Sequence, residues 1–121
     1  MTSNNVGKGI AEFVGTFFLT LTIFIAAVNG IAGVFAPIAI GLTLMVMIYA
    51  LGHVSGAHFN PAVTIGLFLK GDCSQDELPT YLGAQILAGV LAFFVGSELV
   101  LNGADAAEIT AATFDSTIAV L

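Results

Sequence analysis

Charged residues are absent from two long stretches of this 121-residue chain, and these stretches predict its membrane spans. No Asp, Glu, Lys or Arg occurs between Phe13 and Leu69, or between Leu78 and Ser97. A membrane-spanning helix needs roughly 20 apolar residues at a rise of 1.5 Å each. The two stretches together therefore have room for about three spans.

Turn-forming residues divide these stretches into spans at about 9–28, 36–52 and 78–101. Asn29-Gly30 ends the first span, and Pro37 suits the first turn of the second. A polar, glycine-rich break follows, and then an apolar segment of about nine residues, near 14 Å at helical rise. That segment cannot cross a hydrocarbon core of about 30 Å, but it reaches the middle. We therefore expect a re-entrant loop and half-helix over 53–70.

The whole chain, 1–121, reads as a single unit without a linker, and it ends in an acidic tail over 102–121. A signal peptide is the alternative for the amino terminus, but its apolar core spans only 7–15 residues. Here the apolar stretch runs from Phe13 to about Ile31, which fits a retained helix.

Composition supports a membrane protein and excludes several classes of function. Hydrophobic residues make up 58% of the chain and charged residues 8%, against about 25% charged in soluble domains. The net charge of −6 with only two lysines excludes a nucleic-acid partner, which needs basic clusters. The single cysteine excludes both a disulfide within the chain and a thiolate metal cage. We expect an integral membrane protein whose main partner is the lipid bilayer.

The polar break carries the candidate chemistry. Irregular backbone in hydrocarbon costs several kcal/mol for each open polar group, so such a loop must line water or protein. Gly56 and Ala57 are expected to let the chain run extended, with carbonyls turned one way. Asn60 suits the cap of the half-helix and Pro61 its first position, which leaves the Asn60 amide free to donate. With the positive end of the helix dipole nearby, this set suits a single file of neutral hydrogen-bonding molecules and opposes cations.

Residues 55–64, Ser-Gly-Ala-His-Phe-Asn-Pro-Ala-Val-Thr, resemble the first Asn-Pro-Ala loop of the aquaporin and glycerol-facilitator family. Residues 12–17 are similar to that family's first-helix motif, and Ala84-Gln85 to its third-helix Ala-Gln pair. The resemblance covers about residues 8–101. It implies an all-α membrane protein with three transmembrane helices and one re-entrant half-helix, corresponding to half of a six-span fold.

The resemblance also implies roles for individual residues. Asn60, Pro61 and Ala62 would form the Asn-Pro-Ala motif, with Asn60 as the donor in the pore. Glu12 and Gln85 would be buried structural braces for the loop. The expected pore-lining set is Asn60, Ile40, Gly56, Ala57, His58 and Phe59.

Two departures from the family pattern bear on function. Ile40 stands where members of the family typically carry an aromatic residue at the constriction, and an aliphatic side chain there is expected to make the constriction wider and less polarisable. The chain also holds a single Asn-Pro-Ala loop, whereas the family fold is built from two inverted halves. We therefore expect a channel for water or a small neutral solute such as glycerol that conducts only when paired with a second half or in an oligomer.

Alternatives remain open from the sequence. The chain would otherwise be a non-conducting truncated fragment, or an interaction subunit of a full-length channel. Glu12 could relay protons instead of bracing the loop, and His53 and His58 could bind a metal, although zinc sites want three or four ligands. No nucleophile–base pair or phosphate-binding loop is visible, so neither an enzyme nor a cofactor or metal site is expected.

The two lysines predict the orientation. Lys8 and Lys70 fall on the same side if a re-entrant loop lies between full spans, and the positive-inside rule puts that side in the cytoplasm. The amino terminus would then be cytoplasmic in a prokaryotic-type cell membrane, with the acidic tail outside.

Overall fold

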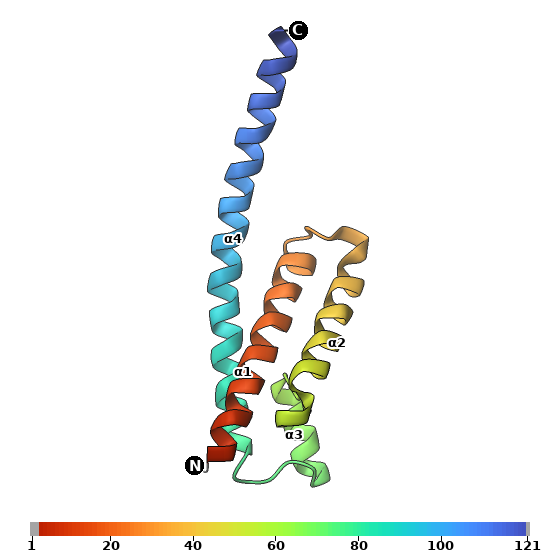
Figure 1. The fold of residues 1–121 in the computed structure, drawn as a ribbon, viewed down its shortest axis with the longest axis vertical. Helices are drawn as coiled ribbons and strands as arrows, with labels where there is room; N and C mark the ends of the chain where they lie inside the picture. The colour runs from red at the N-terminus through yellow and green to blue at the C-terminus, as the bar shows by residue number, and fades with distance from the viewer. Residues whose placement is uncertain (1–2, 121) are drawn as a thin grey trace.

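The computed structural model describes residues 3–120, with side chains from residue 4 to residue 103. Helix α1 (Ser3–Ile23) continues into a π-helical turn, η1 (Phe24–Val28), and a 3-10 turn, η2 (Gly33–Phe35), leads into α2 (Ala36–Ser55). A short helix α3 (Pro61–Lys70) and a long helix α4 (Leu78–Val120) complete the chain (Figure 1). The described residues contain no β-strand.

Within the residues that the structure describes, three helical segments are long and apolar enough to cross a membrane: Asn4–Val28, Gly33–Ser55 and Leu78–Gly103. Helix α3 has only 10 residues, about 15 Å, and is too short to cross. The fold class predicted from the sequence, an all-α membrane protein with three spans and one half-helix, is therefore confirmed.

The ends of the helices differ from the sequence-based bounds. The first helix begins at Ser3, ahead of the expected start near residue 9. Helix α2 continues past residue 52 to Ser55, because Gly56 is where the backbone takes a left-handed conformation (φ 87°) that ends a helix. Helix α4 continues unbroken past residue 101 to Val120. The acidic side chains of the predicted tail lie outside the described side chains.

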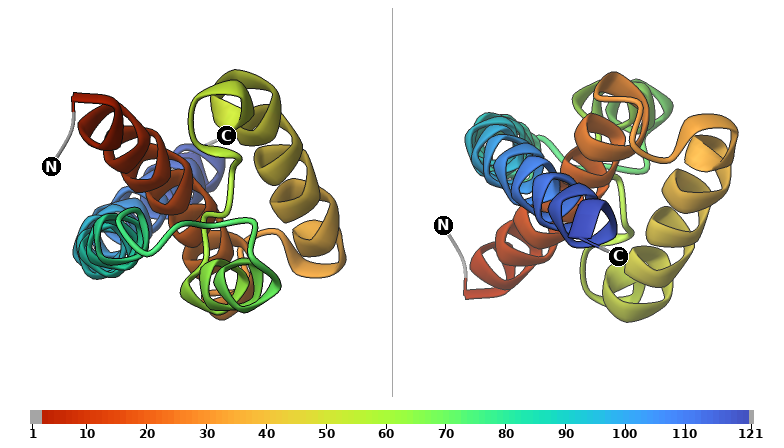
Figure 2. Two further views of the ribbon diagram at one scale, coloured as in Figure 1. Left: turned by 90° about the horizontal axis from the view of Figure 1, so that it is seen from below. Right: turned by 90° about the horizontal axis from the view of Figure 1, so that it is seen from above.

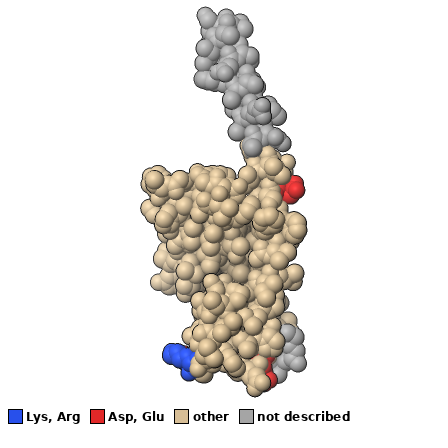
Figure 3. Space-filling model, turned by 180° about the vertical axis from the view of Figure 1, so that it is seen from behind, with Lys and Arg blue, Asp and Glu red and all other residues tan. Residues whose placement is uncertain are grey.

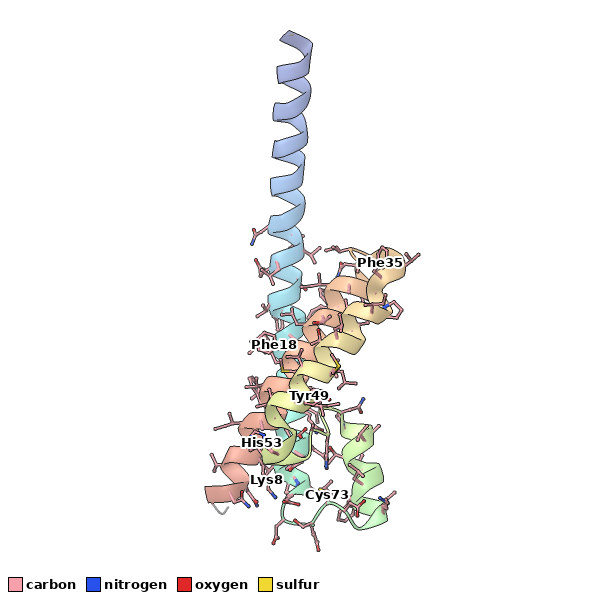
Figure 4. All side chains as sticks on the ribbon, turned by 45° about the vertical axis from the view of Figure 1, so that its right-hand side comes forward. Lys8, Phe18, Phe35, Tyr49, His53 and Cys73 are labelled. Carbon is pink, nitrogen blue, oxygen red and sulfur yellow. The ribbon has the colours of Figure 1, made fainter. Side chains whose placement is uncertain are left out.

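The chain's path is that of a re-entrant segment. Helix α1 lies between α2 and α4, as the views along the long axis show (Figure 2). Helices α1 and α4 begin at one end of the molecule, and α2 and α3 end there; we call this the lower end (Figure 1). After α2, the loop turns back toward the middle, and α3 descends again to the lower end (Figure 4). The amino end of α3 thus lies partway up the helix bundle, above its lower end.

Small residues bring α1 and α4 together. Ala88 and Ala92 of α4 are completely buried. At Gly96 a Cβ atom would come within 2.5 Å of the Phe24 ring, so only glycine leaves room for that ring. Phe24 also meets Phe93 edge to face, with ring centroids 5.3 Å apart. The four-residue spacing of small residues in α4 therefore serves packing within this chain.

The outer surface is suited to lipid. On the face seen in Figure 3, the Lys, Arg, Asp and Glu atoms show only near the bottom and near the upper limit of the described side chains, and an uncharged band lies between them. Helix α2 is the least buried span and carries exposed apolar side chains along its length, among them Ile38, Leu42 and Val46. Together with the three spans, this band marks an integral membrane protein.

An ion pair fixes the lower end. Lys8 of α1 pairs with Glu77, the residue before α4. Hydrogen bonds from Lys8 and from the Ser74 backbone lower the pKa of Glu77 from its ordinary 4.5 to about 2. The link ties the start of α1 to the loop over 71–77, through which α3 connects to α4.

This ion pair predicts an acid-sensitive step in stability. Because the folded-state pKa of Glu77 is depressed, its contribution is complete above pH 4.5 and is lost as the pH falls toward 2. The difference in unfolding temperature between wild type and Glu77→Gln, measured in detergent, should therefore shrink between pH 6 and pH 2.5. Asp76→Asn, an exposed neighbour outside the ion pair, is the control. A difference independent of pH would contradict this assignment.

Candidate functional site

The loop of residues 56–60, here called the Asn60 loop, has an unusual backbone. Gly56 (φ 87°), Ala57 (φ 56°) and Phe59 (φ 52°) all adopt left-handed conformations. The extended run expected at Gly56 and Ala57 is therefore wrong. For residues other than glycine such conformations cost of order 1–3 kcal/mol each and persist only where surrounding contacts hold them. The side chain that makes the most of these contacts is Glu12.

Glu12 of α1 is completely buried, and its carboxylate accepts four hydrogen bonds. Oε1 accepts from the His58 backbone N–H at 2.9 Å and from Ser55 Oγ at 2.6 Å. Oε2 accepts from the Phe59 backbone N–H at 2.6 Å and from Gln85 Nε2 at 2.8 Å. A carboxylate accepts only, with two oxygens, so it satisfies four donors at once. Glu12 thereby holds the loop's left-handed turn against α1.

A second layer of contacts ties the loop to α4. Gln85 Nε2 also donates to Thr64 Oγ1 of α3 at 2.8 Å. The Thr64 hydroxyl lies 3.1 Å from the Asn60 carbonyl oxygen, which also accepts the Thr64 backbone N–H at 3.0 Å. The side chains of Gln85 and Thr64 are both buried. Glu12 and Gln85, distant in the sequence, are thus brought into direct contact around the loop.

Three residues of this network were given no role from the sequence, although the first two stand in the motif over residues 55–64: Ser55, Thr64 and Tyr81. The Tyr81 hydroxyl donates to the Ser55 carbonyl at 2.6 Å, and its ring meets the His58 ring edge to face at 4.8 Å. His58 Nδ1 also lies 3.1 Å from Thr64 Oγ1. The available signals were spacings of four residues, Tyr81 before Gln85 and Asn60 before Thr64, which place each pair on one face of a helix.

Asn60 caps α3 as the sequence predicts for a residue before Pro61. Its backbone is extended (φ −156°, ψ 129°), and its Oδ1 accepts the Ala62 backbone N–H at 2.8 Å. With the oxygen used in the cap, the Nδ2 amide group remains available as a donor. The Asn60 side chain is exposed, and the positive end of the α3 dipole lies directly behind it.

The loop also presents free acceptors. Within the described part of the chain, no group donates to the backbone carbonyls of Gly56, Ala57, His58 or Phe59. The Phe59 side chain is 2% exposed and lies against Gly15, where a Cβ atom would collide with its ring. Phe59 could therefore line a pore through its backbone but not through its side chain.

Ile40 lies apart from the loop, in the second turn of α2. It is half-buried and sits three residues before Thr43, whose hydroxyl is 3.2 Å from that of Thr22 in α1. The structure thus brings Glu12, Gln85, His58 and Asn60 together, and leaves Ile40 closer to the opposite end of the molecule. Among the described residues, no group of three or more His, Cys, Asp or Glu side chains could hold a metal ion.

Comparison with known proteins places the chain in one group. The family model described as "Major intrinsic protein" matches residues 1–120. Aquaporin Z of Photorhabdus laumondii subsp. laumondii is 46% identical over 92 residues, which cover 70% of this chain and 40% of that protein. Aquaporin NIP1-1 of Arabidopsis thaliana is 44% identical over 91 residues, or 70% of this chain and 31% of that protein.

The match therefore spans less than half the length of these relatives. No solved structure gives a significant match.

The Glu12 network predicts the effect of Glu12→Gln. The amide offers one acceptor oxygen in place of two, so one or two of the four donors lose their partner, at about 1–3 kcal/mol each. Hydrogen exchange at the His58 and Phe59 amides should accelerate about tenfold or more, since 1.4 kcal/mol is a factor of ten. Glu98→Gln, at an exposed position on α4, is the matched control. Unchanged exchange at both amides would show that Glu12 does not hold the loop.

Proposed function

Because the chain belongs to the major intrinsic protein family, we propose that it supplies one half of a passive transmembrane channel for water or a small neutral solute such as glycerol. The observation that carries the proposal is the Asn60 loop, where a free amide donor stands next to a run of unpaired carbonyls. Both lie at the depth of the membrane-spanning helices, where backbone polar groups without a partner are tolerated only beside water or protein.

The loop offers both kinds of hydrogen bond that a permeating molecule needs. Asn60 Nδ2 donates to the oxygen of the solute, and the carbonyls of Gly56, Ala57 and His58 accept from its hydroxyl groups. The positive end of α3, equivalent to roughly half an elementary charge, points at the same place and opposes cations. Donors, acceptors and fixed dipoles lining a narrow path select among neutral solutes and ions.

A second half must complete the pathway. Exposed residues run along α3 from its amino end, including Ala62, Val63, Ile65 and Leu69. Among the helices of the described residues, α3 packs against α4 only. Left in lipid, each free carbonyl of the loop would cost several kcal/mol. We infer that a second aquaporin-like half covers this side, entering from the opposite face of the membrane as in inverted-repeat folds.

The orientation follows from the lower end. Lys8 lies in the second turn of α1 and Lys70 is the last residue of α3, so both lie toward that end. The positive-inside rule favours a cytoplasmic lower end and amino terminus.

Stopped-flow light scattering of liposomes tests the proposal. The 121-residue chain alone should leave osmotic water permeability at the level of empty liposomes. Reconstituted together with the carboxy-terminal half of the Photorhabdus Aquaporin Z, it should raise the permeability several-fold. Asn60→Asp should abolish the rise by placing a charge in the pathway, and Glu98→Gln should preserve it. If cross-linking shows that the chain is monomeric in the liposomes and the chain still raises the water permeability by itself, the need for a second half is contradicted.

No rise with any second half, with the chain still bound to that half, would instead favour a non-conducting interaction subunit.

Ile40 provides a separate prediction about the solute. Replacing it with Phe narrows the path if Ile40 faces it, because pore diameter sets which molecules pass. Glycerol flux through the paired halves should then fall more than water flux, measured by stopped flow with each solute in turn. Ile38→Phe, on an exposed face of the same helix, is the control. An equal fall in both fluxes would place Ile40 against lipid or a neighbouring helix.

A further inference from the structure

An apolar groove opens between the first turns of α1 and α4, on the side away from the Asn60 loop. Its volume is about 490 Å³. Its lining includes Gly9, Ile10 and Phe13 of α1 and Gly83, Ala84 and Leu87 of α4. By helical periodicity Ile10 falls on a face turned away from Glu12, and Gly83 and Leu87 fall on a face turned away from Gln85. A second half that covers the loop therefore leaves this groove open.

The groove is short and starts at the membrane boundary. Its lining runs from Val6 to Phe13 on α1 and from Pro79 to Leu87 on α4, about 11 Å along the helix axis. Half of a hydrocarbon core of about 30 Å is about 15 Å, so the groove lies within one leaflet. Phe17, stacked on Phe13 at a centroid distance of 6.4 Å, stands one turn above it.

A spanning partner helix fits this face poorly. Helices associate in lipid along continuous seams of small residues that let their backbones approach. Above the groove, the same face of α4 carries Val90, Leu91 and Phe94, all large and exposed. A flexible chain that enters from the boundary and ends within the leaflet fits better.

The charges at the mouth of the groove indicate the headgroup. Asn5 Nδ2 lies 3.5 Å from the Asp76 carbonyl oxygen, and the mouth residues Val6 and Pro79 are within three residues of this contact. The described lysines, Lys8 and Lys70, are both ion-paired, with Glu77 and Asp72. The Asp76 carboxylate is exposed, and within the described part of the chain it has no ion pair. The mouth thus favours a headgroup that carries an ammonium group over one with a net negative charge.

We propose that this groove binds an acyl chain of a zwitterionic phospholipid whose primary amine lies at the Asp76 carboxylate. The chain fills apolar volume beside Gly9 and Gly83, and the headgroup rests at the lower end. Phosphatidylethanolamine has this chemistry, whereas phosphatidylglycerol has the same acyl chains and a net negative headgroup.

The test is photo-crosslinking of the 121-residue chain in vesicles that contain diazirine-labelled phosphatidylethanolamine or phosphatidylglycerol. Gly83→Leu fills the groove, and Gly89→Leu is the matched control. A Cβ atom at either glycine meets nothing within 4 Å, so neither change disturbs the core. Labelling by phosphatidylethanolamine should fall several-fold in Gly83→Leu and stay unchanged in Gly89→Leu. Asp76→Asn should remove the preference over phosphatidylglycerol while labelling persists.

Equal labelling of wild type and Gly83→Leu would overturn the groove as a lipid site, and equal labelling by the two lipids in wild type would overturn the headgroup assignment. A change of cross-linked oligomers in Gly83→Leu, without a change in lipid labelling, would show a protein interface instead. Circular dichroism checks that each variant folds. Water permeability is not read in this experiment, so its outcome is independent of the channel proposal.

Discussion

The carboxylate of Glu12 is the interaction on which the rest of the structure depends. It is buried within a membrane span, where a charge is expensive unless every acceptor position is used. Its four hydrogen bonds come from the loop backbone at His58 and Phe59, from Ser55 and from Gln85. One side chain of α1 thus joins the end of α2, the re-entrant loop and α4.

The same contacts explain how a short helix can stop inside a membrane. Helix α3 packs against α4 and has little other support from the helices, so its position depends on the polar network. The Thr64 hydroxyl accepts a hydrogen bond from Gln85 and donates one to the Asn60 carbonyl. The Tyr81 hydroxyl donates to the carbonyl of Ser55, the last residue of α2. The left-handed backbone at Ala57 and Phe59 is the strained part of this arrangement. It directs two N–H groups to Glu12 and leaves the loop's carbonyls unpaired.

Most of the fold follows from the distribution of charge along the sequence. Long charge-free stretches and one polar break suffice for three spans and a half-helix. The conformation of the break did not follow, because Ala57 and Phe59 have no intrinsic preference for left-handed backbone. The buried carboxylate, brought from another helix, holds it by accepting the N–H groups of His58 and Phe59. Thr64 and Tyr81 were missed for a related reason: in a helix that is apolar on all sides, hydrophobic periodicity does not show which face is inward. The motif resemblance pointed to Glu12 and Gln85, and the structure adds their direct contact at 2.8 Å.

Solid-state NMR in lipid bilayers tests the central role of Glu12 most directly. The experiment measures carbon–nitrogen dipolar recoupling between the ¹³C-labelled Glu12 carboxyl and ¹⁵N-labelled backbone amides. Our account predicts strong dephasing of the carboxyl signal by the amides of His58 and Phe59, since both N–H groups bond to that carboxylate. The Ala57 amide, which bonds to Ser55 Oγ instead, should give a weaker effect. Equal and weak dephasing by all three amides would contradict the account.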